Sequence, residues 1–379
     1  MNKQRRQKLI ARTAAAGLAV LALAAASTAA AAGATAGTRP LSPSTYPSFA
    51  GRFYGVSATS THDVWAVGIG GTGGQIDHWN GSSWTDYPFS DGYQAVAAQS
   101  PTDVWAVGGS SWFYPSQSLA RHWNGRTWRQ VRTPTPGGSA WFNGVAATSP
   151  DNAWAVGCTC GGPGAEGSPV PLIEHWNGKT WTQQFFRLPV NPGSFSAVTA
   201  TGPDNAWAVG TTGSAAPNGA LIEHWNGHRW RRVAANTTHG YGNLDGVTAV
   251  SPDDVWAAGY TNSGPTYQSL ILHFNGKRWS VVRSPNPTGS TDLIAVSASS
   301  SANAWAVGYT NPNGCDCGTA AFHWNGRAWS ATASVNPPDG FLDAFEGVVA
   351  ITRHDAWAVG TTDWASTIIE HWNGKTWKS

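Results

Sequence analysis

AWAVG at residues 153–157 and EHWNGKTW at residues 174–181 form the stretch of sequence that decides the fold of this chain. Close variants of both motifs recur seven times, and the first Trp of each copy lies 40 to 53 residues after the previous one. These first Trp residues are Trp65, Trp105, Trp154, Trp207, Trp256, Trp305 and Trp357. A repeat of this length is typical of an array of similar structural units.

Each unit contains the pattern of four short strands. In the fifth unit, residues 244–250, 255–259, 270–274 and 278–282 are rich in apolar and β-branched residues and are separated by turn residues. None of the units shows helical periodicity. The sequence therefore predicts an all-β protein, a seven-bladed β-propeller with four antiparallel strands per blade, over residues 51–379.

An Asn-Gly pair follows the third strand of every unit, as in Asn177-Gly178. This pair is the strongest short signal for a two-residue type I′ hairpin turn. Such a turn pairs Trp176 with Lys179 and Glu174 with Trp181, and it places the two Trp residues diagonally on one face.

The first 36 residues have the pattern of a secretory signal peptide, with five basic residues, an apolar core rich in Ala and Leu, and the small residues 34–36 as a cleavage site. Arg5-Arg6 leaves twin-arginine export open beside the general secretory route. Residues 37–50 are predicted to be a leader rich in Ser, Thr and Pro. We therefore expect a secreted, extracellular protein.

Removal of the signal peptide changes the charge balance. Five of the 23 basic residues and none of the 21 acidic residues leave, so the exported chain carries 18 − 21, or −3. A mildly acidic chain without a run of Lys or Arg argues against nucleic acid as a partner and against membrane insertion after cleavage. We expect no cofactor and no metal, and a monomer.

The repeated aromatic and His residues are interpreted as scaffold. Twenty of the 23 Trp residues recur at fixed positions, as core packing requires. The His before the second Trp, such as His175, is expected to form a blade-to-blade hydrogen bond. The Asp or Asn two residues before the first Trp, such as Asn152, is expected to close its own turn. The carboxylates before the His (Asp77, Glu174, Glu223 and Glu370) give way to Arg, Leu or Phe in other units, which suggests a tolerant position.

The variable residues are expected on one face of the disc, called here the variable-loop face, which carries the connections between the second and third strands and between units. Trp112, Trp141 and Trp364 stand outside the repeat and are expected in these loops as ligand contacts. One position in the first strand of each unit also varies, and its seven side chains are expected to surround the channel mouth as a binding site. They are Tyr54, Gln94, Asn143, Ser196, Asp245, Ile294 and Glu346.

Two further hypotheses concern catalytic carboxylates and disulfide bonds. Asp245 and Glu346, with Asp292 and Asp343, could supply the two carboxylates of a glycosidase near the channel mouth. The four cysteines form two close pairs, Cys158 with Cys160 and Cys315 with Cys317, in the loops between the second and third strands. Export favours two local disulfides, and free thiols are the alternative.

The repeats resemble the Trp-rich WAVG…HWNGxxW repeats of secreted bacterial β-propellers. The NGxxW element is also similar to a degenerate Asp-box of the BNR type, with His in place of Ser or Thr and Asn in place of Asp. The likeness to kelch propellers is limited to architecture, because the diglycine and the spaced Tyr are missing. The resemblance implies the turn and the fold, and it does not imply sialidase activity.

The sequence favours a non-catalytic binding propeller that recognises carbohydrate or a cell-envelope glycan through the variable-loop face. Two alternatives stay open. One is an extracellular glycoside hydrolase or lyase that uses the carboxylates at the channel mouth, and the other is a scaffold for protein interactions.

Overall fold

The structure is a computed structural model that describes most of residues 50–379, all in one compact unit. The positions left out of this range are 72, 111–115, 160–168, 190, 192, 214–218, 236–240, 263–265, 287–288, 312–317, 336–342 and 364–365. The predicted signal peptide and nearly all of the predicted leader lie outside the described residues. In the described part, no helix combines the length and the hydrophobicity needed to cross a membrane.

Twenty-eight strands form seven sheets of four. The first four blades are β1 (Gly51–Ser60), β2 (Asp63–Gly70), β3 (Gly73–Trp79) and β4 (Trp84–Phe89); β5 (Gly92–Ser100), β6 (Asp103–Gly109), β7 (Ser118–Trp123) and β8 (Trp128–Val131); β9 (Ala140–Ser149), β10 (Asn152–Thr159), β11 (Val170–Trp176) and β12 (Trp181–Gln183); and β13 (Ser194–Gly202), β14 (Asn205–Thr211), β15 (Ala220–Trp225) and β16 (Trp230–Arg232). The last three are β17 (Tyr241–Ser251), β18 (Asp254–Asn262), β19 (Gln268–Phe274) and β20 (Trp279–Val282); β21 (Ser290–Ser300), β22 (Asn303–Asn311), β23 (Gly318–Trp324) and β24 (Trp329–Ala331); and β25 (Ala344–Thr352), β26 (Asp355–Thr362), β27 (Ser366–Trp372) and β28 (Trp377–Lys378). A 3-10 turn covers Pro136–Gly138.

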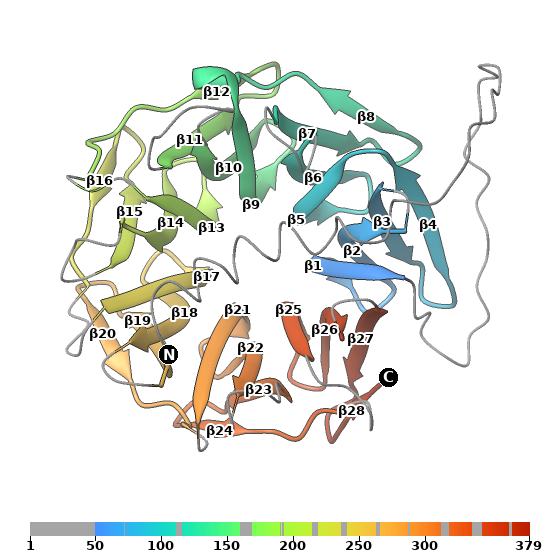
Figure 1. Ribbon diagram of the computed structural model, residues 1–379, viewed down its shortest axis with the longest axis vertical. Helices are drawn as coiled ribbons and strands as arrows, with labels where there is room; N and C mark the ends of the chain where they lie inside the picture. Colours follow the sequence, from blue (N-terminus) through green and yellow to red (C-terminus); the bar gives the residue numbers. More distant parts are fainter. Residues whose placement is uncertain are drawn as a thin grey trace, which may run out of the picture. The chain divides into compact units, whose positions relative to one another are not determined.

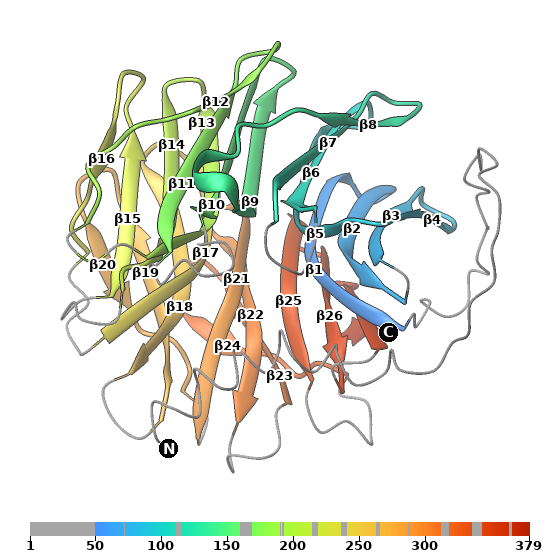
Figure 2. The same cartoon turned by 45° about the horizontal axis from the view of Figure 1, so that its top comes forward.

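The strands of each blade follow one another in chain order as an antiparallel meander. The first strands of the blades stand around a common axis, and the fourth strands lie at the rim (Figure 1). The tilted view shows β9, β21 and β25 around that axis, while β4, β8 and β16 lie at the outside (Figure 2). The predicted seven-bladed propeller with four antiparallel strands per blade is therefore confirmed.

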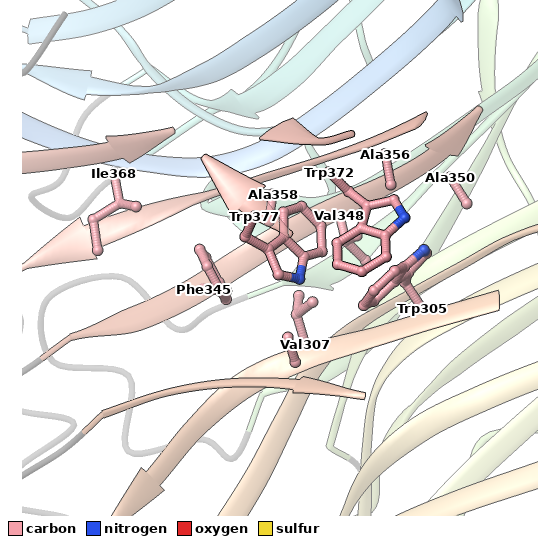
Figure 3. Close-up of a cluster of buried hydrophobic side chains, with 11 residues drawn as sticks. Trp305, Val307, Phe345, Val348, Ala350, Ala356, Ala358, Ile368, Trp372 and Trp377 are labelled. Carbon is pink, nitrogen blue, oxygen red and sulfur yellow. The ribbon is translucent and has the colours of Figure 1, made fainter. Parts of the chain in front are cut away.

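The repeated Trp residues form the contact between blades. Trp305 of blade six packs on the second and closing Trp residues of blade seven, Trp372 and Trp377, with ring centroids 4.9 and 4.8 Å away (Figure 3). The equivalent contact between a first Trp and the closing Trp of the next blade recurs around the ring at 4.8 to 5.8 Å, with ring planes 73 to 89° apart. Edge-to-face packing adds to the free energy gained by burying these large rings.

The recurrent His is structural, but its predicted hydrogen bond between blades is wrong. The ring of His175 packs on Trp154 of its own blade, with centroids 4.2 Å apart and planes tilted by 31°, and its Nε2 lies 2.7 Å from Oδ1 of Asn152 in the neighbouring strand β10. The other six blades repeat this arrangement, with His-to-Asp or His-to-Asn distances of 2.6 to 3.1 Å. The Asp or Asn therefore holds the His ring against the Trp instead of only closing its own turn.

The Asn-Gly turns have a longer loop than predicted. Trp176 pairs directly with Trp181, so the hairpin loop has four residues, and the predicted two-residue register is wrong. Oδ1 of Asn177 accepts the backbone N–H groups of Lys179 and Thr180, both at 3.0 Å. This side-chain cap competes with the tighter turn because it satisfies two backbone donors at once.

Gly178 lies in this turn at φ +84°, and a Cβ there would approach Oδ1 of Asp151 to 2.1 Å. Gly178→Ala should therefore destabilise the protein by about 1–2 kcal/mol, the cost of a left-handed conformation for a residue with a side chain. Gly202→Ala is the control, because a Cβ there meets nothing within 4 Å and no positive φ is needed. Urea unfolding measures both variants, and equal stability of the two would contradict this account of the turn.

The ring closes without exchange of a strand, because blades one and seven each keep four strands of their own. Trp357 of blade seven packs on Trp79 and Trp84 of blade one, both at 5.8 Å. Ala50, just before β1, also forms a β-bridge with Ser366 of β27. The chain ahead of β1 thus reaches the last blade at one residue.

The position before each His is not simply tolerant, because its side chain is buried wherever it is acidic. Asp77 and Glu370 are fully buried, and Glu223 is paired with Arg232 at 2.9 Å. Glu174 is also fully buried, and within the described residues neither of its carboxyl oxygens has a hydrogen-bond partner. Burial raises the pKa of Glu174 to about 8.

This carboxyl makes stability depend on pH. The folded protein holds a proton on Glu174 that the unfolded chain releases near pH 4.5, so its contribution is complete below that pH and is lost as pH rises to about 8. Glu174→Gln should raise the melting temperature at pH 8 by at least about 2 °C, which corresponds to about 1 kcal/mol, and change it little at pH 4. Thermal unfolding at both values tests this.

Glu223→Gln is the matched comparison, because Glu223 is equally buried but has an Arg partner that the change leaves behind. That variant should not become more stable at pH 8. If the melting temperatures of Glu174→Gln and of the unchanged protein differed by the same amount at pH 4 and at pH 8, the account of a protonated Glu174 would be refuted.

Candidate functional site

The innermost strand of every blade contains a β-bulge, and the bulged residue is the varying one singled out in the sequence. In β1 the pairing register skips Tyr54 between Phe53 and Gly55, and in β17 it skips Asp245 between Leu244 and Gly246. A bulge leaves one residue out of the ladder and redirects its side chain. The residue before the bulge stays in the core, since Phe53 and Leu244 are fully buried.

The seven bulged residues line one axial hollow with a volume of about 430 Å³. All seven are half-buried, so each side chain is partly open to this space. We call them the axial ring: Tyr54, Gln94, Asn143, Ser196, Asp245, Ile294 and Glu346. The structure thus brings together the residues that the sequence placed around the channel mouth, while their role as a binding site stays a prediction.

A collar of small residues follows the axial ring. Gly and Ala alternate here, and a Cβ on Gly144 or Gly246 would lie 2.9 Å from the Cα of the Ala in the next blade. Because seven is odd, two glycines meet between the last and first blades, where a Cβ on Gly347 would lie 3.2 Å from the Cα of Gly55. The collar lets the inner strands approach closely and fixes the spacing of the ring residues.

One charged part of the axial ring lies between blades seven and one, and Asp245 of blade five is the other. Arg52 of β1 forms an ion pair with Glu346 of β25 at 3.3 Å, and its guanidinium lies 5.4 Å from the ring centre of Tyr54. Burial raises the pKa of Glu346, although Arg52 acts against this, and Asp292 adds to the rise. Burial also raises the pKa of Tyr54 to about 12, so its hydroxyl keeps its proton.

The remaining carboxylates near the mouth are also held by neighbours. Nδ2 of Asn243 donates to both oxygens of Asp245, at 2.6 and 2.7 Å. The hydroxyl of Tyr309 donates to Asp292 at 3.1 Å. Asp343 is buried just before β25 and does not line the axial hollow. The predicted group of four carboxylates is therefore only partly assembled.

The opposite side of the ring is uncharged. Gln94, Asn143 and Ser196 come from blades two, three and four, and Nδ2 of Asn143 donates to the carbonyl of Phe195 at 2.8 Å. The side chains of Gln94 and Ser196 have no hydrogen bond to any part of the chain that the structure describes. These two amide and hydroxyl groups are free to bind a ligand.

The predicted loop contacts have mixed outcomes. Trp141 lies in β9, not in a loop, and it is half-buried, with its ring where a Cβ on Gly109 would be. Trp112 and Trp364 fall outside the described residues. Cys158 is buried in β10 and not in a loop, while Cys160, Cys315 and Cys317 are also outside, so the disulfides stay a prediction.

Sequence reasoning missed Arg52 and Asn243, and it named Asp292 only as a candidate acid. All three lie on the inner strands two residues before a ring position, on the side of the variable loops. That spacing is the signal that could have identified them. Among the residues described here, no group of three or more His, Cys, Asp or Glu is placed to hold a metal ion.

Comparisons with known proteins agree with the architecture. No protein-family model matches the sequence, and no curated protein matches it either. Similar solved structures include YCF48 bound to D1 peptide, with a TM-score of 0.54, 14% identity and coverage of 87% of this chain and 95% of that one. YCF48 from Cyanidioschyzon merolae gives 0.56, 13%, 87% and 97%, and the WD40 propeller domain of Doa1 gives 0.58, 10%, 88% and 97%.

At such low identity these likenesses show the fold alone. The chain is a seven-bladed, Trp-rich β-propeller, a fold typical of binding and interaction scaffolds. The fold does not name a ligand.

Proposed function

We propose that this protein is a non-catalytic binding propeller whose axial ring recognises a carbohydrate or cell-envelope glycan. The observation that carries the proposal is the convergence of seven bulged, half-buried and mostly polar side chains on one hollow. A rigid scaffold that presents a few convergent polar groups in a concave space is the usual form of a ligand site.

The chemistry of the ring suits a neutral, hydroxyl-rich ligand. Gln94 and Ser196 offer both donors and acceptors, and Asp245 offers acceptor oxygens to hydroxyl protons. Asp245 disfavours an anion in the hollow, whereas a sugar hydroxyl can donate to its carboxylate. Tyr54 and Ile294 give the same hollow an apolar part that the C–H groups of a sugar ring could contact.

The alternatives use the same hollow. A glycoside hydrolase or lyase would need Asp245 or Glu346 as an acid or base, but Arg52 pairs with Glu346 and Asn243 donates to both oxygens of Asp245, so each carboxyl is already held by a protein partner. A protein ligand is the second candidate, because one propeller with this fold is described bound to a peptide. We retain the glycan because the free groups of the ring are small and neutral.

The test is binding of the full protein to a broad glycan array, followed by calorimetry with the best ligand. Gln94→Ala and Ser196→Ala should each weaken binding by about tenfold, the loss expected for one hydrogen bond of about 1.4 kcal/mol. Their melting temperatures should not change, because neither side chain bonds to the described protein.

Gln130→Ala is the matched control, since Gln130 is an exposed glutamine on the outer strand β8. It should leave affinity unchanged. The absence of any glycan ligand, or equal affinity of the Gln94→Ala and Gln130→Ala variants, would show that the axial ring is not a glycan site. Turnover of a bound glycan that is lost in Asp245→Ala or Glu346→Ala would support the enzyme instead.

The proposal includes export, which the basic and apolar N-terminal pattern supports. A glycan of the cell envelope is accessible to the protein only outside the cytoplasm.

A further inference from the structure

An exposed aromatic side chain follows the outer strand of blade three. Phe185 is 85% exposed, the highest value among the large hydrophobic side chains of the described residues. Its neighbour Phe186 turns inward and packs on Phe195 at 5.5 Å, and Gln184 donates its N–H to the carbonyl of Ile173 at 2.8 Å. The segment is thus anchored on one side, which fixes Phe185 toward solvent.

Phe185 lines a hollow at the rim, where the end of blade three meets the outer strand of blade four. This rim groove has a volume of about 420 Å³, and its walls come from two segments of the chain, residues 185–187 and 229–232. It is separate from the axial hollow, because the two share no residue.

The rim groove concentrates positive charge. Four of its seven lining residues are arginines, Arg187, Arg229, Arg231 and Arg232, and none is acidic. Glu223 pairs with Arg232 at 2.9 Å but is itself 1% exposed, so it neutralises one arginine from beneath the surface. In the part of the chain that the structure covers, the other three have no ion pair. Such a local cluster attracts anionic groups although the exported chain is expected to be net negative.

The groove also borders a free strand edge. β16 is the last strand of its sheet, so its outer edge carries backbone groups that no strand of the sheet pairs. An extended peptide can add to such an edge through main-chain hydrogen bonds, with its alternate side chains directed into the groove.

We propose that the rim groove is a docking site for an extended, acidic peptide segment of a partner protein. Carboxylates of the segment would pair with Arg187 and Arg229, and an apolar side chain would cover Phe185. The exposed Phe decides between a peptide and an inorganic or sugar polyanion, because a chain of phosphates offers nothing apolar to cover it. Aromatic residues such as Phe, together with Arg, are also enriched at the core of protein–protein interfaces.

The test uses the full protein and a labelled seven-residue peptide that alternates glutamate with leucine or phenylalanine, measured by fluorescence anisotropy. We expect saturable binding that weakens as salt increases. Phe185→Ser and Arg229→Gln should each reduce affinity by at least about fivefold, the effect of losing about 1 kcal/mol. The same peptide with glutamine in place of glutamate should lose at least as much affinity for the unchanged protein as the original peptide loses for either variant.

The matched controls lie in blade five. Arg278 occupies the position equivalent to Arg229, and Val281 is an exposed apolar residue on the outer strand β20. Arg278→Gln and Val281→Ser should leave the affinity unchanged, and Gln94→Ala in the axial ring should do the same.

Three results would overturn the proposal. The first is that the peptide does not bind. The second is that polyphosphate binds as well as the peptide and that Phe185→Ser has no effect. The third is that Gln94→Ala, and not Phe185→Ser, abolishes peptide binding. The second would make the groove a general anion site, and the third would move the peptide to the axial ring. Whether a glycan binds the axial ring does not affect any of these three results. The glycan site and the peptide site can therefore fail independently.

Discussion

The packing of one Trp against the aromatic pair of the next blade is the interaction on which this structure depends. It repeats around the disc, and it closes only because Trp357 of the last blade meets Trp79 and Trp84 of the first. In blades two, three, four and six the second Trp is fixed further by its own indole N–H, which in Trp176 donates to the carbonyl of Pro150 at 2.9 Å. Several first and closing Trp residues, such as Trp154 and Trp230, bury an indole N–H that has no hydrogen-bond acceptor among the residues that the structure describes. The edge-to-face packing of these rings adds favourable free energy beyond their burial, which acts against that cost.

Because of this packing between blades, the residues that hold the scaffold together are different from the residues of the axial ring. The first Trp, the His stacked on it and the capped Asn-Gly turn hold the middle and outer strands of each blade in one register. The bulge on the innermost strand then releases one residue per blade from that register, and the collar brings these residues to a common axis. A ring residue can therefore change without disturbing the aromatic packing, as the contrast between Ile294 and Glu346 shows.

The sequence was sufficient for the fold and for the members of the axial ring, because both are periodic. It was not sufficient for the bulges, since one extra residue in a strand leaves the composition of the repeat unchanged. The Asn177 cap and the bond from His175 to Asn152 depend on side-chain geometry that spacing does not reveal. The rim groove could not be predicted from the sequence, because Phe185 lies outside the repeat pattern and its groove is completed by arginines of the following unit, more than 40 residues later.

A repeated scaffold can recognise a partner only where its units differ, and the two hollows use this in different ways. The axial ring takes one residue from every blade, so its chemistry is a sum of seven small differences and combines neutral, acidic and apolar groups. The rim groove takes several residues from one junction, so a single unusual unit gives it a strong and uniform charge. Because carboxylates such as Asp245 line the first hollow and arginines the second, the two surfaces favour ligands of different charge. The carboxylates of the axial ring would thus repel the acidic peptide proposed for the rim groove, so the charges of the two surfaces keep the two proposed ligands at separate places on the disc.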